Sequence, residues 1–226
     1  WELAAAGILT TDTRPKLRST SVDLDGRPIH VTGIAKGSGM IKPNMATMLA
    51  YVATDARVDP AAMADMVRRA TDHSFNCITV DGDTSTNDAL VVIATGAAGN
   101  AVPEIGSAAF ETIYAAIEAV CIELAKDIVR DGEGATKFVS VSVRGGKDEE
   151  ACRKVAYTVA ESPLVKTAMF ASDPNWGRIL AAIGRSPDVE FDLVDIDIDI
   201  GGHQLIKRGQ PAPGYDETVV ASLMQN

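Results

Sequence analysis

A glycine-rich stretch that leads into an apolar run constrains the fold of this chain more than any other part of its sequence. Three glycines lie between positions 33 and 39, and Pro43-Asn44 follows them. Glycine adopts left-handed conformations and lets other groups approach closely, whereas proline followed by asparagine favours a bend. Thr47 then opens the apolar run 48–53, which predicts a buried strand. The sequence therefore predicts a tight loop that brings a hydroxyl group to the start of a core strand.

The position of that hydroxyl group suits self-cleavage. Thr47 follows the small residue Ala46, so its hydroxyl can attack the accessible carbonyl of the preceding peptide bond. Ester formation and hydrolysis would then separate Ala46 from Thr47. The new α-amine titrates near pH ~8 and can act as general base for the Thr47 hydroxyl, as in other N-terminal threonine nucleophiles. An ordinary Gly-Pro loop before a strand is the alternative interpretation of the same residues.

The motif KGSGMIKPNMATML at 36–49 closely resembles the self-cleavage motif of the bifunctional ornithine acetyltransferase family, also called glutamate N-acetyltransferase, of arginine biosynthesis. The resemblance extends from the first residues to about Gly209. It implies an α/β fold with strand layers and helices packed outside them, of the self-processing N-terminal-nucleophile type found in ornithine acetyltransferases and aminopeptidases. Five further blocks resemble family segments in the family's order: 10–16, 81–88, 126–137, 162–167 and 172–178.

The resemblance also implies an activity. Thr47 would take the acetyl group from N-acetylornithine, release ornithine, and pass the acetyl group to glutamate. We expect no resident cofactor and no metal. Acetyl-coenzyme A is an alternative donor in some family members, and the sequence leaves that donor open. No other nucleophile in the chain competes well with Thr47.

Substrate-binding residues are carried over from the family at Thr10, Lys36, Thr47 and Glu133. Thr10 begins a hydroxyl-rich turn in which Thr13 is the second choice, and a loop of locally bonded Asp and Thr side chains is the alternative there. Lys36 would bind the α-carboxylate that both substrates share. Glu133 lies in a Gly-flanked turn, where a carboxylate could hold the cationic amine of ornithine or simply be solvated.

Two other functions stay open: a self-cleaving amidase or aminopeptidase, in which water accepts the acyl group, and an inactive remnant with an uncut Ala46–Thr47 bond. The family's oxyanion donors precede Trp1, and its C-terminal substrate ligands follow Asn226. We therefore expect an internal fragment, inactive or weakly active alone. Residues 1–46 would end the α-chain, 47–226 would form a truncated β-chain, and the full-length protein would assemble as an α2β2 heterotetramer.

Composition excludes several classes of partner. The net charge of −10 argues against nucleic acid and anionic membranes, and no apolar run approaches the ~20 residues of a membrane span. Three widely spaced cysteines indicate reduced thiols and a cytoplasmic location. The acidic segment 81–88 resembles a calcium loop, but Thr86 stands where that loop needs Gly and Val92 where it needs Glu.

Hydrophobic periodicity and turn residues predict the remaining elements. Gly26 separates two hairpin strands, Asp59-Pro60 starts a helix, and an apolar stripe from Phe110 to Ile128 predicts a long helix that ends near Arg130. The two hairpin strands are predicted at 18–25 and 27–32, and further strands at 77–80, 89–94, 138–144 and 192–200. Further helices are predicted at 151–160, 173–184 and 217–224. A loop is predicted at 162–168.

Overall fold

A computed structural model describes residues 1–42, 48–84 and 86–225. The chain divides into two compact units, Trp1–Ala135 (unit 1) and Thr136–Asn226 (unit 2), each with its own hydrophobic core. Both units combine strands with helices, as the α/β prediction requires. Within the described residues, no helix is long and apolar enough to cross a membrane.

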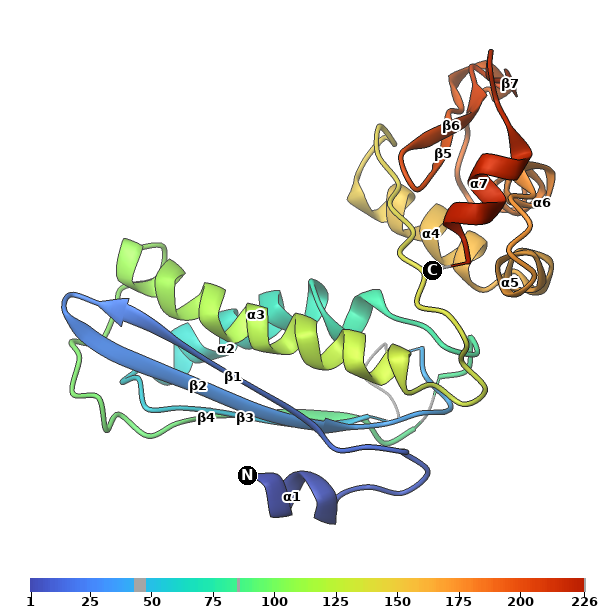
Figure 1. Ribbon diagram of the computed structural model, residues 1–226. Helices are drawn as coiled ribbons and strands as arrows, with labels where there is room; N and C mark the ends of the chain where they lie inside the picture. Colours follow the sequence, from blue (N-terminus) through green and yellow to red (C-terminus); the bar gives the residue numbers. More distant parts are fainter. Residues whose placement is uncertain (43–47, 85, 226) are drawn as a thin grey trace. The chain divides into compact units, whose positions relative to one another are not determined.

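Unit 1 is built on a mixed sheet in which the described strands follow one another in chain order (Figure 1). The pairs β1–β2 and β2–β3 are antiparallel, and β3–β4 is parallel. The predicted hairpin is confirmed: Asp25 and Gly26 form its two-residue loop with φ of 53° and 77°, and positive φ at both positions matches the twist of the flanking strands. The strands are β1 (Lys16–Leu24), β2 (Arg27–Lys36), β3 (Leu49–Thr54) and β4 (Ala89–Ala94).

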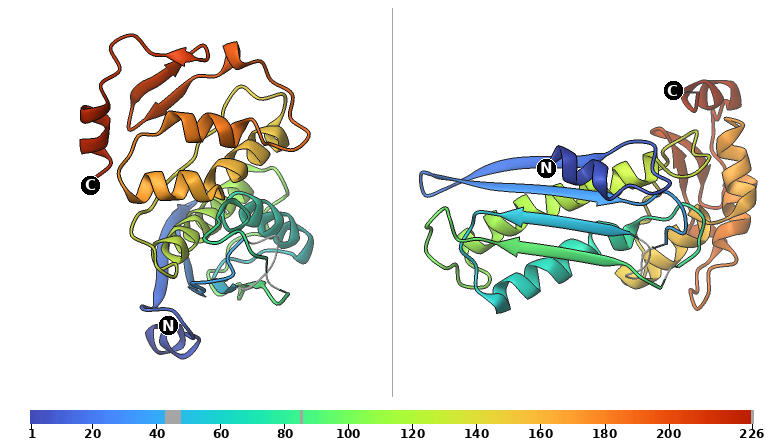
Figure 2. Two further views of the ribbon diagram at one scale, coloured as in Figure 1. Left: turned by 90° about the vertical axis from the view of Figure 1, so that its right-hand side faces the viewer. Right: turned by 90° about the horizontal axis from the view of Figure 1, so that it is seen from below.

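Two helices, α2 (Pro60–Asp72) and α3 (Ala108–Arg130), cover one face of this sheet, and the short α1 (Glu2–Gly7) lies on the other face (Figures 1 and 2). The predicted start of α2 is confirmed, because the Asp59 carboxylate accepts a hydrogen bond from the Ala62 N–H at 2.8 Å and Pro60 occupies the first turn. The helix α3 begins after Ser107, whose hydroxyl caps the Phe110 N–H, and it ends at Arg130 as its apolar stripe predicts.

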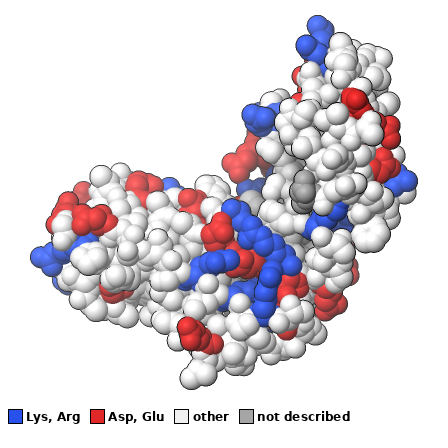
Figure 3. Space-filling model, viewed as in Figure 1, with Lys and Arg blue, Asp and Glu red and all other residues white. Residues whose placement is uncertain are grey.

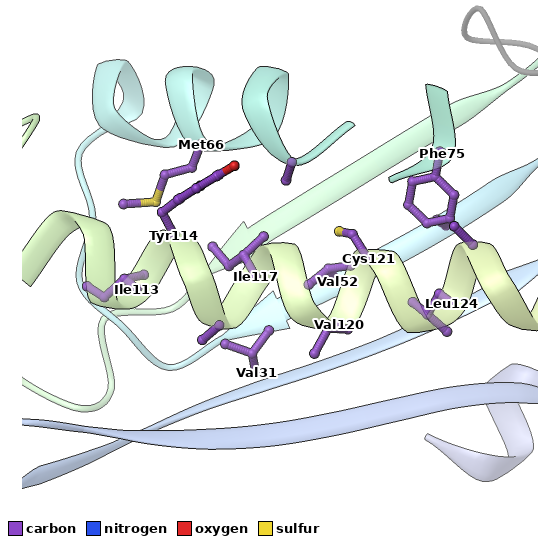
Figure 4. Packing of buried hydrophobic residues seen from close by; sticks show 14 of the residues in the cluster. Val31, Val52, Met66, Phe75, Ile113, Tyr114, Ile117, Val120, Cys121 and Leu124 are labelled. Atoms are coloured by element: carbon purple, nitrogen blue, oxygen red, sulfur yellow. The ribbon is translucent and has the colours of Figure 1, made fainter. Parts of the chain in front are cut away.

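The core of unit 1 lies between α3, α2 and the sheet (Figure 4). Ile117 and Leu124 of α3 are fully buried and contribute roughly 1.5–3 kcal/mol each through burial of apolar area. Gly33 allows α3 to approach β2 closely, since a Cβ atom there would lie 3.0 Å from side-chain carbons of Val52, Val120 and Leu124. The first glycine of the glycine-rich stretch is therefore a packing residue of the sheet.

One predicted strand of unit 1 is wrong. Residues 75–77 form a 3-10 helix, η1 (Phe75–Cys77), and 78–80 are irregular. The Cys77 N–H donates to the Ser74 carbonyl at 2.9 Å, so the chain is still turning as it leaves α2. Apolar residues alone could not reveal that turn.

Unit 2 joins four described helices to a small antiparallel sheet of order β5-β6-β7. Its core includes Val159, Ile179, Leu205 and Val220. The elements are α4 (Glu149–Ala160), α5 (Pro163–Phe170), α6 (Trp176–Ile183), the 3-10 helix η2 (Leu193–Asp195), β5 (Ile198–Ile200), β6 (His203–Lys207), β7 (Gln210–Pro211) and α7 (Glu217–Leu223).

Three sequence predictions for unit 2 are corrected. Residues 138–144 form no strand and belong to neither of the described sheets. The predicted loop 162–168 is largely the helix α5, which Ser162 caps and Pro163 begins. The predicted strand 192–200 is reduced to β5, because the Asp192 carboxylate caps the Val194 N–H and turns the chain into η2.

Candidate active site

The glycine-rich loop after β2 is held by carboxylates from two distant segments. The Gly37 N–H donates to Asp12 Oδ1 at 2.6 Å. The N–H groups of Met40 and Ile41 donate to the two carboxylate oxygens of Asp81 at 2.6 and 3.0 Å. The φ angle of Met40 is +57°, a left-handed conformation that is strained in a residue with a side chain, whereas Gly37 adopts its φ of +148° without that strain. The loop is therefore fixed from both sides before it enters residues 43–47.

Two of the predicted substrate-binding residues meet beside this loop. Lys36 Nζ donates to Thr10 Oγ1 at 3.4 Å, across a separation of 26 residues. Thr10 is exposed and Lys36 is half-buried, so both groups remain accessible to a ligand. Thr13, the second choice, instead donates its N–H and its hydroxyl to the Asp131 carboxylate. The geometry thus favours Thr10 over Thr13 as the ligand-facing hydroxyl.

Glu133 approaches the same loop from the end of α3. Its N–H donates to the Ser38 carbonyl at 2.8 Å. Its carboxylate lies against Gly39, where a Cβ atom would be 2.8 Å from Glu133 Oε1. A side chain at position 39 would displace the exposed Glu133 carboxylate from its place against the loop, so the loop glycine leaves room for it.

Ala46 and Thr47, the predicted cleavage site and nucleophile, lie outside the described residues. Their roles therefore stay predictions. The described chain resumes at Met48, whose carbonyl accepts a hydrogen bond from the Ala89 N–H at 3.0 Å as β3 and β4 begin to pair.

The sequence analysis did not identify three charged residues that connect these segments: Asp12, Lys16 and Asp131. The side chain of Lys16 is only 1% exposed, and its Nζ lies 2.6 Å from both Asp12 Oδ1 and Asp131 Oδ2. Burial by itself raises the pKa of Asp12, but the Gly37 N–H and the Lys16 ammonium outweigh it and hold that pKa below its ordinary value. For Asp131, burial is likewise outweighed by Lys16 and Thr13, and the pKa is lowered.

The sequence did carry a signal for part of this cluster. Asp12 and Lys16 are four residues apart in the block 10–16, and Asp131 lies in the block 126–137. Local bonding of the turn, the alternative considered from sequence, is present in one contact, because the Thr10 N–H donates to Asp12 Oδ2 at 3.3 Å. The long-range contacts to Gly37 and Asp131 depend on tertiary structure.

Asp88 is a further ionisable group close to the start of β3. Burial raises its pKa to about 6, against the opposing effects of the Met48 N–H and the positive charge of Lys36. Together with Met48, Thr71 and Phe75 it lines a small cavity of about 10 Å³. A carboxyl group in this environment exchanges its proton near neutral pH.

A separate group of charges lies where the C-terminal half of α3 crosses β1, and Figure 3 shows basic and acidic side chains intermingled there. Arg18 Nε lies 2.7 Å from Asp127 Oδ2, and Arg130 and Lys126 pair with Asp127 and Glu123 on the same helix. The described residues contain no group of His, Cys, Asp and Glu suited to a metal ion.

Comparison with known proteins gives consistent matches. A sequence model of the ArgJ family matches residues 2–226. Curated proteins named "Arginine biosynthesis bifunctional protein ArgJ" are 52% identical in Pseudomonas syringae pv. tomato, 53% in Pseudomonas fluorescens and 51% in Methylococcus capsulatus. These alignments cover 99–100% of this chain and 55–56% of the relatives, so the chain spans about half of their length.

A solved structure supports the fold. The crystal structure of the arginine biosynthesis bifunctional protein ArgJ from Bacillus halodurans superposes with a TM-score of 0.74 at 40% identity, and the match covers 77% of this chain and 81% of that chain. The α/β fold class predicted from the sequence is confirmed by this likeness.

Proposed function

Since this chain belongs to the ArgJ family, we propose that the full-length protein is an acetyltransferase that moves the acetyl group of N-acetylornithine to glutamate. The observation that carries this proposal is the convergence of three sequence-distant residues on one loop. Thr10 and Lys36 are in contact, and Glu133 lies against Gly39 of the same loop. A cation and a hydroxyl at the end of β2 and a carboxylate against Gly39 of the following loop suit an amino-acid substrate with both charges.

The proposed reaction proceeds through two covalent steps. In the first, the Thr47 hydroxyl attacks the acetyl carbonyl of N-acetylornithine, the C–N bond breaks, and the departing amine of ornithine takes a proton. In the second, the amine of glutamate attacks the acetyl ester, and the Thr47 oxygen regains its proton. The free α-amine of Thr47 would accept and return that proton, and division into two steps is the gain of nucleophilic catalysis.

That α-amine arises only by cleavage. The Thr47 hydroxyl would attack the Ala46 carbonyl, and the C–N bond would break to give an ester and the free α-amine of Thr47. Water would then hydrolyse the ester, which leaves a carboxylate on Ala46 and restores the Thr47 hydroxyl. The proposal includes the α2β2 assembly, the cytoplasmic location and acetyl-coenzyme A as an alternative donor. It includes no resident cofactor.

The test is the intact mass of the purified full-length protein, wild type beside Thr47→Ala, followed by a product assay. We expect two fragments that separate between Ala46 and Thr47 in the wild type, and one chain in the variant. The wild type should form N-acetylglutamate and ornithine. Release of free acetate without N-acetylglutamate would identify an amidase instead, and an uncut wild-type chain would identify an inactive remnant.

A further inference from the structure

Three buried charges lie between the segments that carry the predicted substrate-binding residues. The Lys16 ammonium bridges Asp12 and Asp131 with two contacts of 2.6 Å, and the two carboxylate side chains are 0% and 3% exposed. Their lowered pKa values mean that both carboxylates are ionised at neutral pH. The bridge joins residues that are 115 positions apart in the chain.

Asp12 connects this bridge to one side of the candidate site. Its carboxylate accepts hydrogen bonds from the N–H of Thr10 at 3.3 Å and from the N–H of Gly37 at 2.6 Å. One amide belongs to Thr10 itself, and the other belongs to the residue that follows Lys36. Asp12 therefore sets the separation of the two backbone segments whose side chains meet at 3.4 Å.

Asp131 connects the bridge to the opposite side. It lies two residues before Glu133, in the turn that ends α3. Besides Lys16, it accepts hydrogen bonds from the N–H and the hydroxyl of Thr13. The turn is then joined to the glycine-rich loop by the bond from the Glu133 N–H to the Ser38 carbonyl. Asp131 thereby fixes the backbone position from which the Glu133 side chain extends.

Stability alone does not account for such a cluster. Apolar residues of similar volume are often as stable as a buried ion pair or more so, because removing charges from water is costly. The ions instead fix the relative positions of chain segments, since each carboxylate oxygen accepts hydrogen bonds from defined donors. The long-range donors to this cluster among the described residues, Gly37, Thr13 and Lys16, lie in segments that carry a predicted ligand.

We propose that Asp12, Lys16 and Asp131 are positioning residues of the substrate site. Through Asp12 they hold Lys36 and Thr10 for the α-carboxylate that both substrates share, and through Asp131 they hold Glu133 for the cationic amine of ornithine. This inference rests on the proposed function. It predicts that the two carboxylates affect the two substrates differently, which a general loss of stability does not do.

The test compares Asp12→Asn and Asp131→Asn in the full-length protein. In a two-step transfer, kcat/KM for each substrate reports on its own half reaction. Asp12→Asn should lower kcat/KM about tenfold for both substrates, the scale of one charge-assisted hydrogen bond. Asp131→Asn should lower it about tenfold for N-acetylornithine and less than about twofold for glutamate. Both losses should reside in KM, with kcat nearly unchanged.

A matched control is Asp127→Asn, one turn earlier on α3. Asp127 is also shielded from solvent, but its carboxylate pairs with Arg18 and Arg130 rather than with residues of the candidate site. Its kinetics should match the wild type. Equal losses for both substrates in both test variants, or a similar loss in the control, would overturn the positioning role.

Milder variants keep the test decisive if an Asp→Asn chain does not fold. Thr13→Val removes only the hydroxyl that donates to Asp131, and Asp12→Glu keeps the charge but shifts it by one methylene. The same substrate pattern is expected with smaller amplitude, and its absence in folded protein would overturn the inference. A wild-type protein that transfers no acetyl group would overturn the proposed function itself, a result that requires no variant.

Discussion

Unit 1 contains a buried cluster of charges, whereas the ion pairs along α4 in unit 2 are exposed. In unit 1, Lys16 and its two carboxylate partners are almost completely removed from solvent. In unit 2, the pairs Arg153–Glu149 and Lys154–Glu150 lie along the outer surface of α4, where Glu149 and Glu150 are 76% and 78% exposed. Exposed pairs of this kind contribute little to stability, whereas breaking a buried pair leaves a charge that nothing compensates. Removing a charge from the buried cluster of unit 1 should therefore lower the free energy of unfolding far more than removing a charge from α4.

The largest expected difference comes from removing one lysine in each unit. Lys16→Met should lower the free energy of unfolding by about 3–5 kcal/mol, because two buried carboxylates lose their shared cation. Lys154→Met, on the surface of α4, should leave the denaturation midpoint almost unchanged. Urea denaturation followed by circular dichroism measures both, and equal midpoints for the two variants would remove the contrast between the units.

A second contrast uses the same substitution in both units. Gly33→Ala should destabilise the protein by about 1–3 kcal/mol, since the new methyl group would lie 3.0 Å from three packed side chains. Gly177→Ala, on the exposed side of α6, should stabilise by up to about 0.5–1 kcal/mol because alanine is the better helix residue. Thermal melts of the two variants should shift in opposite directions, and shifts of the same sign would contradict the packing described for Gly33.

The smallest expected effect depends on pH. Because the pKa of Asp88 rises from 3.8 to about 6 on folding, the folded state carries an unfavourable carboxylate above about pH 6, and this penalty disappears below about pH 4. Asp88→Asn should therefore raise the melting temperature at pH 8 and leave it nearly unchanged at pH 4.

The control for that measurement is an exposed carboxylate in unit 2. Asp199 lies on the exposed side of β5, so Asp199→Asn removes no buried charge and should shift the melting temperature only slightly. A pH-independent effect of Asp88→Asn would mean that burial does not disfavour the ionised form of Asp88.

The sequence predicted those parts of the fold that local signals determine. Asp59-Pro60 and the apolar stripe of α3 give a helix start and a buried face that need no distant partner. Apolar alternation did not give a strand at 138–144, and in 192–200 only 198–200 became one, because a side-chain cap such as Asp192 can turn the chain first.

Some residues of the candidate site could likewise be predicted from the sequence, and others could not. Thr10, Lys36 and Glu133 were predicted through motifs that resemble a family. Lys16 was missed because a lysine in a polar turn is usually solvated. Its burial belongs to the tertiary structure, in which Asp131 reaches its ammonium from a position 115 residues later.

The antiparallel pairing of β2 with β3 has a consequence for the proposed cleavage. A cut after Ala46 would fall between these neighbouring strands, so β1 and β2 would belong to one product and β3, β4 and α3 to the other. Six residue pairs, from Val31 with Thr54 to Lys36 with Leu49, would then become an intermolecular ladder. Dissociation would require opening the sheet and exposing its core, so dilution should not separate the two products, although a denaturing gel would. Cleavage of the folded precursor would therefore yield two chains that are already associated, with no separate association step between free subunits.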